Sequence, residues 1–194
     1  MRLFHLLLGL VLGLALVAPA TAEYGRLVPG QSRLEFVSRQ MGVPVSGQFR
    51  KFDLRMAFDP ARPATARAVL EIDMTGVDAG YPEANEEVVT ANWLDVRRFP
   101  HARFESTAIR PLGGHRYELR GRTTIKGRTA EMVLPVTFTP AGRSAVLEGA
   151  FTLKRLAWGI GQGPWGDPST VADEVEVKFR FVVEQAATAP PARR

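Results

Sequence analysis

The residues whose spacing most suggests chemistry lie near the C-terminus, in the segment "WGIGQGPWGDPS" at residues 158–169. Within it, residues 161–166 read GQGPWG and match the pattern G-x-G-x-x-G. In a dinucleotide-binding protein these glycines follow a strand and open a helix, whose first N–H groups bind the pyrophosphate. Here the stretch "EVEVKFRFVVE" comes next and alternates as a strand does, and Pro164 removes one N–H donor. We therefore interpret the glycines as a loop between two strands and predict no nucleotide site.

Other candidate catalytic or metal-ligating residues are sparse. The chain has no cysteine, and of its three histidines His5 lies in the N-terminal apolar segment, which leaves His101 and His115. Neither has a partner at metal-ligand spacing, and no G-x-S-x-G nucleophile motif occurs. Glu86 and Glu87 are adjacent, so on a helix they point in different directions and are better interpreted as a solvated face than as a carboxylate pair. We expect neither an enzyme nor a metal or cofactor site.

The elements that position these residues follow a simple rule, because apolar and polar side chains alternate through most of the chain from residue 33 onward. Such alternation is typical of strands with one buried face. The apolar sets are Phe52, Leu54, Met56 and Phe58; Ala68, Leu70, Ile72 and Met74; Met132, Leu134, Val136 and Phe138; and Val175, Val177, Phe179, Phe181 and Val183. Short turn sequences separate the strands and favour an antiparallel meander.

About eight strands of this kind predict an all-β fold, an antiparallel barrel that leaves no sheet edge unpaired. A flat two-sheet sandwich stays open as an alternative. Periodicity does not decide whether the interior of a barrel is filled or hollow.

One segment, "YPEANEEVVTANWLDVRRFP" at residues 81–100, lacks the alternation. Pro82 stands near its start, acidic residues follow in the first turn, and Pro100 ends it. These features predict a short helical insert, either one helix or two shorter ones broken near Asn92.

Both ends of the chain are predicted to lie outside the folded domain. Residues 1–22 combine a positive start, a short apolar run and a small-residue pattern that ends at Ala22, which indicates a secretory signal peptide cleaved there. A membrane anchor is the alternative, but the apolar run is short for a span. Residues 186–194 have nothing to bury and predict a disordered tail. The domain is then residues 23–185, and in a Gram-negative bacterium the mature protein is expected in the periplasm.

The charge of the chain argues against a nucleic-acid partner. It has 25 basic and 20 acidic residues, a net charge of +5, and the two signs are interspersed rather than gathered in a basic stripe. A mild positive excess of this kind suits an anionic head group or a membrane surface.

The segment "NWLDVRRFPHARFEST" at residues 92–107 is similar to a motif of the YceI-like proteins. The stretches "GQFRKFD", "LRGRTTIKGRTAEMVLPVTF" and "LKRLAWGIGQGPW" also occur in the order that the family has, so the resemblance covers about residues 27–184. It implies a secreted or periplasmic protein, folded as an extended lipocalin-like barrel with a helical segment over one end. It also implies that the barrel holds a long apolar molecule, a polyisoprenoid or an isoprenoid-quinone chain.

Carried onto this sequence residue by residue, the resemblance implies an apolar lining and a set of head-group contacts. The implied lining is Phe36, Phe49, Trp93, Phe99, Phe104, Trp158 and Phe181, and the implied head-group contacts are Arg39, Arg155 and Gln162. Each aromatic residue is equally a candidate for ordinary core. Family members commonly carry two histidines in the first strand region, where this chain reads "QSRLEF" and "QMG", so any contact made by those histidines is lost.

From these features we expect a periplasmic carrier of a polyprenyl phosphate or an isoprenoid quinone. The ending "WGIGQGPW…VADEV" also resembles members associated with membrane cytochromes of the b561 type, which implies such a cytochrome as a partner. Two alternatives stay open. One is an interaction protein with a filled barrel that docks a membrane redox partner through its helix or tryptophan loop, and the other is a lipid-modifying enzyme.

Overall fold

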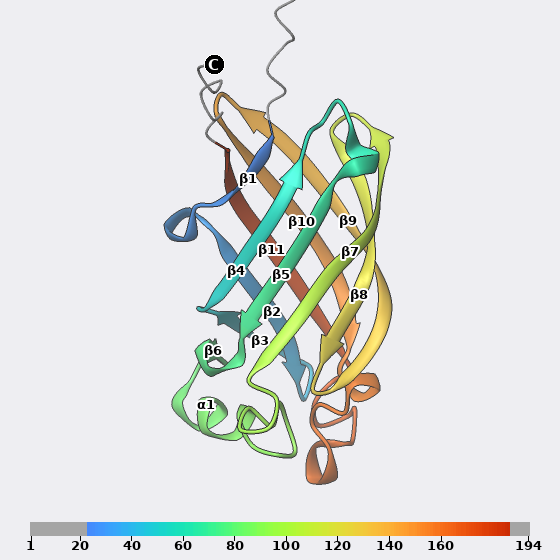
Figure 1. Ribbon diagram of the computed structural model, residues 1–194. Coiled ribbons are helices and arrows are strands. Elements are labelled where there is room, and N and C mark those ends of the chain that lie inside the picture. The colour runs from blue at the N-terminus through green and yellow to red at the C-terminus, as the bar shows by residue number, and fades with distance from the viewer. Residues whose placement is uncertain (1–22, 187–194) are drawn as a thin grey trace, which may run out of the picture.

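Long antiparallel strands wind around one axis in the computed structural model, which describes residues 23–186 of the chain (Figure 1). The predicted signal peptide with its cleavage site at Ala22, and residues 187–194 of the predicted tail, lie outside the described residues. The strands are β1 (Tyr24–Leu27), β2 (Arg33–Gln40), β3 (Val43–Phe49), β4 (Phe52–Phe58), β5 (Arg67–Asp73), β6 (Val77–Asp78), β7 (His101–Gly113), β8 (Arg116–Ile125), β9 (Arg128–Ala141), β10 (Ser144–Lys154) and β11 (Glu174–Gln185).

Helical structure is confined to short pieces in the described part of the chain. They are the α-helix α1 (Pro82–Val88) and the 3-10 turns η1 (Pro29–Gln31), η2 (Pro63–Thr65), η3 (Met74–Gly76), η4 (Arg155–Trp158) and η5 (Gly163–Trp165). Among residues 23–186, no helix combines the length and the apolar character that crossing a bilayer requires.

The sheet closes on itself because β11 pairs with both β1 and β2, and β1 also pairs with β4. Counted as one strand interrupted by η1, β1 and β2 complete a ring of eight antiparallel strands with β4, β5, β7, β8, β9, β10 and β11. At the lower end in Figure 1, β3 and β6 extend the sheet beyond β2. The predicted barrel is confirmed, and the sandwich alternative is wrong.

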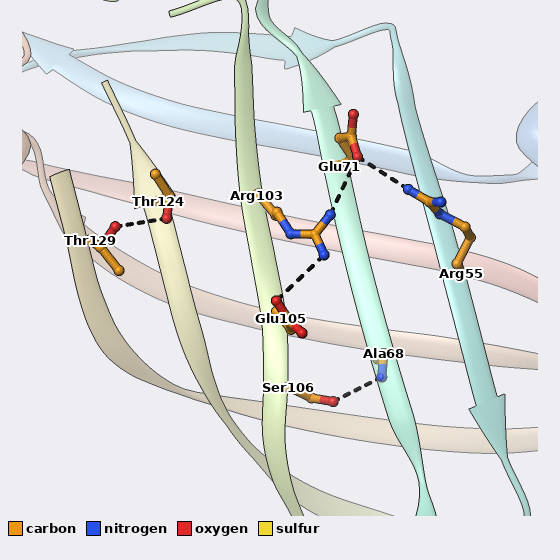
Figure 2. A network of polar contacts seen from close by, with 8 residues as sticks. All are labelled: Arg55, Ala68, Glu71, Arg103, Glu105, Ser106, Thr124 and Thr129. Atoms are coloured by element: carbon orange, nitrogen blue, oxygen red, sulfur yellow. Dashed lines mark hydrogen bonds and ion pairs between the residues drawn. The ribbon is translucent and has the colours of Figure 1, made fainter. Parts of the chain in front are cut away.

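The alternation predicted from the sequence places apolar side chains inside and charged ones outside. On the outer face, Glu71 of β5 lies 3.2 Å from Arg55 of β4 and 3.6 Å from Arg103 of β7, and Arg103 lies 3.4 Å from Glu105 (Figure 2). Ion pairs between exposed neighbours of this kind contribute little stability each, but they keep the outer face polar.

A bulge in β7 lies beside a backbone N–H group that hydrogen-bonds to a side chain. The register between β7 and β8 shifts after Ser106, and the buried Ser106 hydroxyl accepts a hydrogen bond of 2.8 Å from the backbone N–H of Ala68 (Figure 2). The hydroxyl thus satisfies a strand donor that would otherwise be buried without a partner.

The two ends of the barrel differ. Four aromatic rings from β1, β4, β8 and β9 pack together at the end where the described chain begins and ends: Tyr24, Phe58, Tyr117 and Phe138. At the other end lie α1, the turns after it and the segment of residues 155–173 between β10 and β11 (Figure 1). A second buried cluster of Met74, Leu94, Ala102, Trp158 and Ile160 seals part of that end.

The helical insert is shorter than the sequence predicts, whether as one helix up to Pro100 or as two helices broken near Asn92. It ends at Val88, and turns follow: the Leu94 N–H donates to the Val88 carbonyl at 3.0 Å, and Asp95 adopts a positive φ of 50°. A continuous right-handed helix has no place for that φ. A single helix reaching Pro100, or a second one after Asn92, is therefore wrong, because the chain turns back to bury Leu94 at the barrel end.

Candidate ligand-binding site

A narrow chamber runs inside the barrel. Its volume is about 160 Å³, and the inward-facing sets of β4, β5, β9 and β11 line it together with residues of the neighbouring strands. Three polar residues border it, Arg103, Tyr117 and Thr123, and the guanidinium of Arg103 is the one that pairs with Glu71 and Glu105 on the outer face. We call this space the deep chamber. The apolar lining of this chamber follows from the sequence, because alternating strand residues place their apolar side chains on the inner face.

A second chamber of about 410 Å³ lies at the α1 end, between β2, β3, α1 and the segment of residues 155–173. It reaches the surface beside the exposed Tyr81 and Glu83. We call it the mouth chamber. The two chambers share five lining side chains, Phe49, Leu94, Leu153, Ile160 and Val177, so they lie end to end.

The polar side chains around the mouth chamber tie its walls together. Tyr81, just before α1, donates a 3.1 Å hydrogen bond from its hydroxyl to the side-chain oxygen of Gln40 at the end of β2. Trp165 donates from Nε1 to the Glu87 carboxylate at 2.8 Å and thereby connects η5 to α1. The helix that borders the mouth is thus held from two sides.

Arg155 organises the segment between β10 and β11. Its side chain is 1% exposed, and all five N–H donors reach backbone carbonyls at 2.6–3.0 Å. The acceptors are the carbonyls of Ile160, Gly161, Trp165, Val171 and Ala172. Burial lowers the pKa of this guanidinium below its ordinary value, while the nearby Asp173 opposes the shift. The group remains a cation at neutral pH, and its donors are fully used within the protein.

The Arg155 side chain also explains the glycines that resemble a nucleotide motif. Gly161 has a φ of +72°, and a side chain there would overlap the Arg155 guanidinium. Gly159 likewise has a φ of +70°, at the end of η4. The glycines therefore let the loop wrap a buried cation. The prediction that the loop joins two strands is confirmed, since it connects β10 to β11.

Trp93 and Trp165 form an aromatic wall of the mouth chamber, with ring centroids 5.7 Å apart. The Arg155 guanidinium lies 5.5 Å from the Trp93 ring centroid. Trp93 Nε1 is buried without a hydrogen-bond partner in the described part of the chain. A cation over an indole face is a favourable contact, so Arg155 fixes this wall as well as the loop.

Two further charged groups hold the mouth together. Lys126, in the turn between β8 and β9, donates from Nζ to the carbonyls of Ala91 at 2.8 Å and Gly159 at 2.6 Å. Burial lowers the pKa of Lys126. Asp78 of β6 accepts hydrogen bonds from Gln48, the Gly80 N–H, Arg50 and Asn85, which together hold its pKa far below the ordinary value.

The residues predicted from the resemblance fall into different places. Phe104 and Phe181 line the deep chamber, Phe36 and Trp93 line the mouth chamber, and Phe49 lines both. The other predicted residues are Trp158, which is buried in the cluster that seals the barrel end; Phe99, which lines neither chamber and packs near Gly127; Arg155, which borders the mouth; and Arg39 and Gln162, which are exposed and line neither chamber.

Several residues of the mouth chamber carry little or no sequence signal of their position. Glu87 reads as a solvated helix residue, yet it lines the mouth chamber and binds Trp165. Gln40 and Tyr81 lie 41 positions apart in the chain and meet only through the fold. An aromatic residue such as Tyr81 just before a helix is a weak sequence signal of a binding-site residue, and nothing in the sequence marks Gln40 as one.

Comparison with known proteins agrees with this architecture. A model of the YceI-like domain matches residues 26–183, so the chain belongs to the YceI-like family. A UPF0312 protein of Pseudomonas savastanoi pv. phaseolicola is 28% identical over 187 residues, which cover 91% of this chain and 96% of that one. With a UPF0312 protein of Vibrio cholerae the identity is 29% over 99 residues, and this match spans about half the length of that relative (52%).

Solved structures share the fold. The crystal structure of Burkholderia cenocepacia BcnA is 39% identical, with a TM-score of 0.78 over 84% of this chain and 99% of that one. A polyisoprenoid binding domain from Saccharophagus degradans, implicated in plant cell wall breakdown, is 16% identical, with a TM-score of 0.65 over 86% of this chain and all of that one. At that identity the second likeness shows the fold alone.

Proposed function

We propose that the protein binds the chain of a long isoprenoid lipid inside the barrel and acts as a carrier for it. The observation that carries the proposal is the pair of adjacent, largely apolar chambers that share five lining side chains, the outer of which is bordered by exposed residues beside α1. The name of the Saccharophagus degradans domain, a polyisoprenoid binding domain of the same fold, supports this class of ligand.

The physical basis is the burial of apolar surface. Each methylene taken from water contributes about 0.8 kcal/mol, so one five-carbon isoprene unit contributes roughly 2–4 kcal/mol before the cost of ordering the chain is subtracted. Affinity is therefore expected to depend more on the length of the chain than on its head group.

For the head group, the mouth chamber favours an uncharged ring such as a quinone over a phosphate. Glu83 and Glu87 line the mouth, and two carboxylates repel an anionic head group. The cation that borders the mouth, Arg155, has no free N–H donor for a direct hydrogen bond to a phosphate. We expect a quinone to bind about tenfold more tightly than a polyprenyl phosphate of equal length, a difference of about 1.4 kcal/mol.

Secretion to the periplasm and a membrane cytochrome of the b561 type as partner remain predictions from the sequence. A carrier for a membrane lipid requires a donor or acceptor at the membrane, and a quinone-handling cytochrome fits that requirement. The alternative of a filled barrel that serves only for docking is not favoured by the two chambers.

The test is to block the channel where the chambers meet. Val177 lines both chambers, whereas Val133 is 48% exposed. Val177→Trp fills the junction and should abolish the binding of ubiquinone with four isoprene units, measured by isothermal titration calorimetry. Val133→Trp, the matched control, should bind as the wild type does. Overpacking costs about 1–3 kcal/mol, so circular dichroism first confirms that each variant is folded. Unchanged binding by folded Val177→Trp would contradict the proposal.

A further inference from the structure

The barrel end away from α1 is closed by buried aromatic rings. There the rings of Tyr24, Phe58, Tyr117 and Phe138 meet with centroid separations of 4.7–6.4 Å. Their exposed fractions are 4%, 4%, 9% and 1%, respectively. Three of them, Phe58, Tyr117 and Phe138, line the deep chamber, and Tyr24 packs edge-on behind Phe138. We call these four rings the aromatic floor.

Building on the proposed lipid-binding function, we propose that the aromatic floor sets how far an isoprenoid chain can enter and thereby limits the chain length that the protein recognises. The tail end of the chain lies against the floor, and the head group stays in the mouth chamber beside α1.

The rigidity of the floor follows from its construction. Its four rings come from four strands of the closed barrel and are buried against one another, so rotating one ring out of its place must displace a neighbouring ring. Three of the four contacts are edge-to-face at interplanar angles of 77–90°, and Phe58 meets Phe138 at 62°. Edge-to-face packing is a favourable arrangement of aromatic rings. A flexible prenyl chain ends at such a wall more readily than it displaces it.

The polarity of the two barrel ends determines the proposed orientation of the ligand. The floor offers few polar partners, whereas the mouth carries Gln40, Tyr81, Glu83 and Glu87. A head group placed at the floor would lose its hydrogen bonds with water without replacing them, and that loss is costly in an apolar site. The chain therefore enters tail first.

The volumes give the expected limit. An engineered apolar cavity of about 150 Å³ holds one benzene, which has six carbon atoms. By that measure the deep chamber of about 160 Å³ holds roughly one isoprene unit, and the mouth chamber of about 410 Å³ holds roughly three. By the same measure the substituted ubiquinone ring, with about thirteen heavy atoms, fills roughly 330 Å³ of the mouth chamber, so about two isoprene units fit between the ring and the floor. Affinity should rise at least tenfold with each unit up to about two units and less than threefold for each unit beyond, since the extra length no longer fits inside.

The experiment measures the affinity of ubiquinone homologues with one to eight isoprene units for the wild type and three variants. Phe58→Ala removes about six carbon atoms from the floor, so the tenfold rise should continue for one further unit. Ala68→Leu adds bulk in the deep chamber, which Ala68 lines, so the plateau should begin at a shorter chain. Phe99→Ala makes the same deletion outside both chambers and should leave the plateau where the wild type has it.

Orientation has its own readout in the same titration. All three tryptophans of the chain, Trp93, Trp158 and Trp165, lie at the α1 end. The floor is about 25 Å away, the axial length of a tilted strand of about ten residues. A quinone ring in the mouth should quench their fluorescence strongly. Ubiquinone that binds with weak quenching would place the head at the floor and overturn the proposed orientation.

The outcomes separate the two proposals. If no homologue binds the wild type, the proposed function fails. If the wild type binds with a plateau that neither folded Phe58→Ala nor Ala68→Leu moves, the floor does not set the length and lipid binding stands. Ala68→Leu keeps the test decisive if Phe58→Ala does not fold.

Discussion

At the scale of single residues, Arg155 shows how a candidate binding residue can turn out to be architectural. From the sequence, an arginine near a barrel end is predicted to bind a phosphate or a quinone oxygen. In the fold it is buried and gives every donor to a backbone carbonyl of its own loop. A buried cation in such a cage stabilises the loop because removing it leaves the carbonyls unpaired.

We therefore predict that Arg155→Lys lowers the free energy of unfolding by about 2–4 kcal/mol, because an ammonium has three donors and cannot reproduce the planar fork. Urea unfolding measures this change. Arg39→Lys, at an exposed position that makes one long contact of 3.5 Å with the Gly42 carbonyl, is the control and should shift stability by less than about 0.5 kcal/mol. Equal stability of Arg155→Lys and the wild type would contradict the architectural role.

At the scale of elements, Asp78 of β6 anchors the mouth by joining β3 to α1. Its carboxylate accepts hydrogen bonds from Gln48 and Arg50 on one side and from Asn85 of α1 on the other. These bonds favour the ionised form and lower its pKa. A carboxyl with a lowered folded pKa stabilises the protein above its unfolded pKa of about 3.9, and that stabilisation is lost as the pH falls below this value.

Asp78→Asn should accordingly reduce the free energy of unfolding by about 1–2 kcal/mol at pH 7, and the difference from the wild type should shrink as the pH falls from 4 toward 2.5. Thermal unfolding across that pH range tests both statements. Asp53→Asn, whose side chain is 63% exposed, is the control and should show a small difference at every pH. A gap that stays constant down to pH 2.5 would mean that the charge of Asp78 does not matter.

The strands of this fold are predictable from sequence, and its loops much less so. The inward faces of β4, β5, β9 and β11 follow from alternation, because a strand side chain can point only to one side or the other. The insert does not follow as well: Asp95 reverses the chain at a positive φ, which no periodicity encodes. The mouth depends on pairs such as Gln40 with Tyr81 that only the closed barrel brings together.

At the scale of the whole molecule, the two ends of the barrel are built differently, and we propose that one stabilises the fold while the other admits the ligand. The aromatic floor closes one end with buried rings, and the other end is built from α1 and the tryptophan loop, held by a few charged groups around an apolar opening. A closed barrel supplies the rigid wall, and loops supply the opening, which is the usual distribution of stability and function in a protein. The same apolar interior accounts for the core of the fold and for the expected ligand.

The most direct test of this account is native mass spectrometry of the protein expressed in a Gram-negative host with its predicted signal peptide and purified from the periplasm without detergent, with Glu23 as the predicted first residue. The account predicts one prenylated molecule for each chain, identified after extraction with organic solvent. It also predicts that the stripped protein takes up one ubiquinone when that lipid is offered. A protein that carries no lipid as purified, and whose mass is unchanged after ubiquinone and polyprenyl phosphate are offered, would contradict the claim that the barrel is a lipid-binding channel.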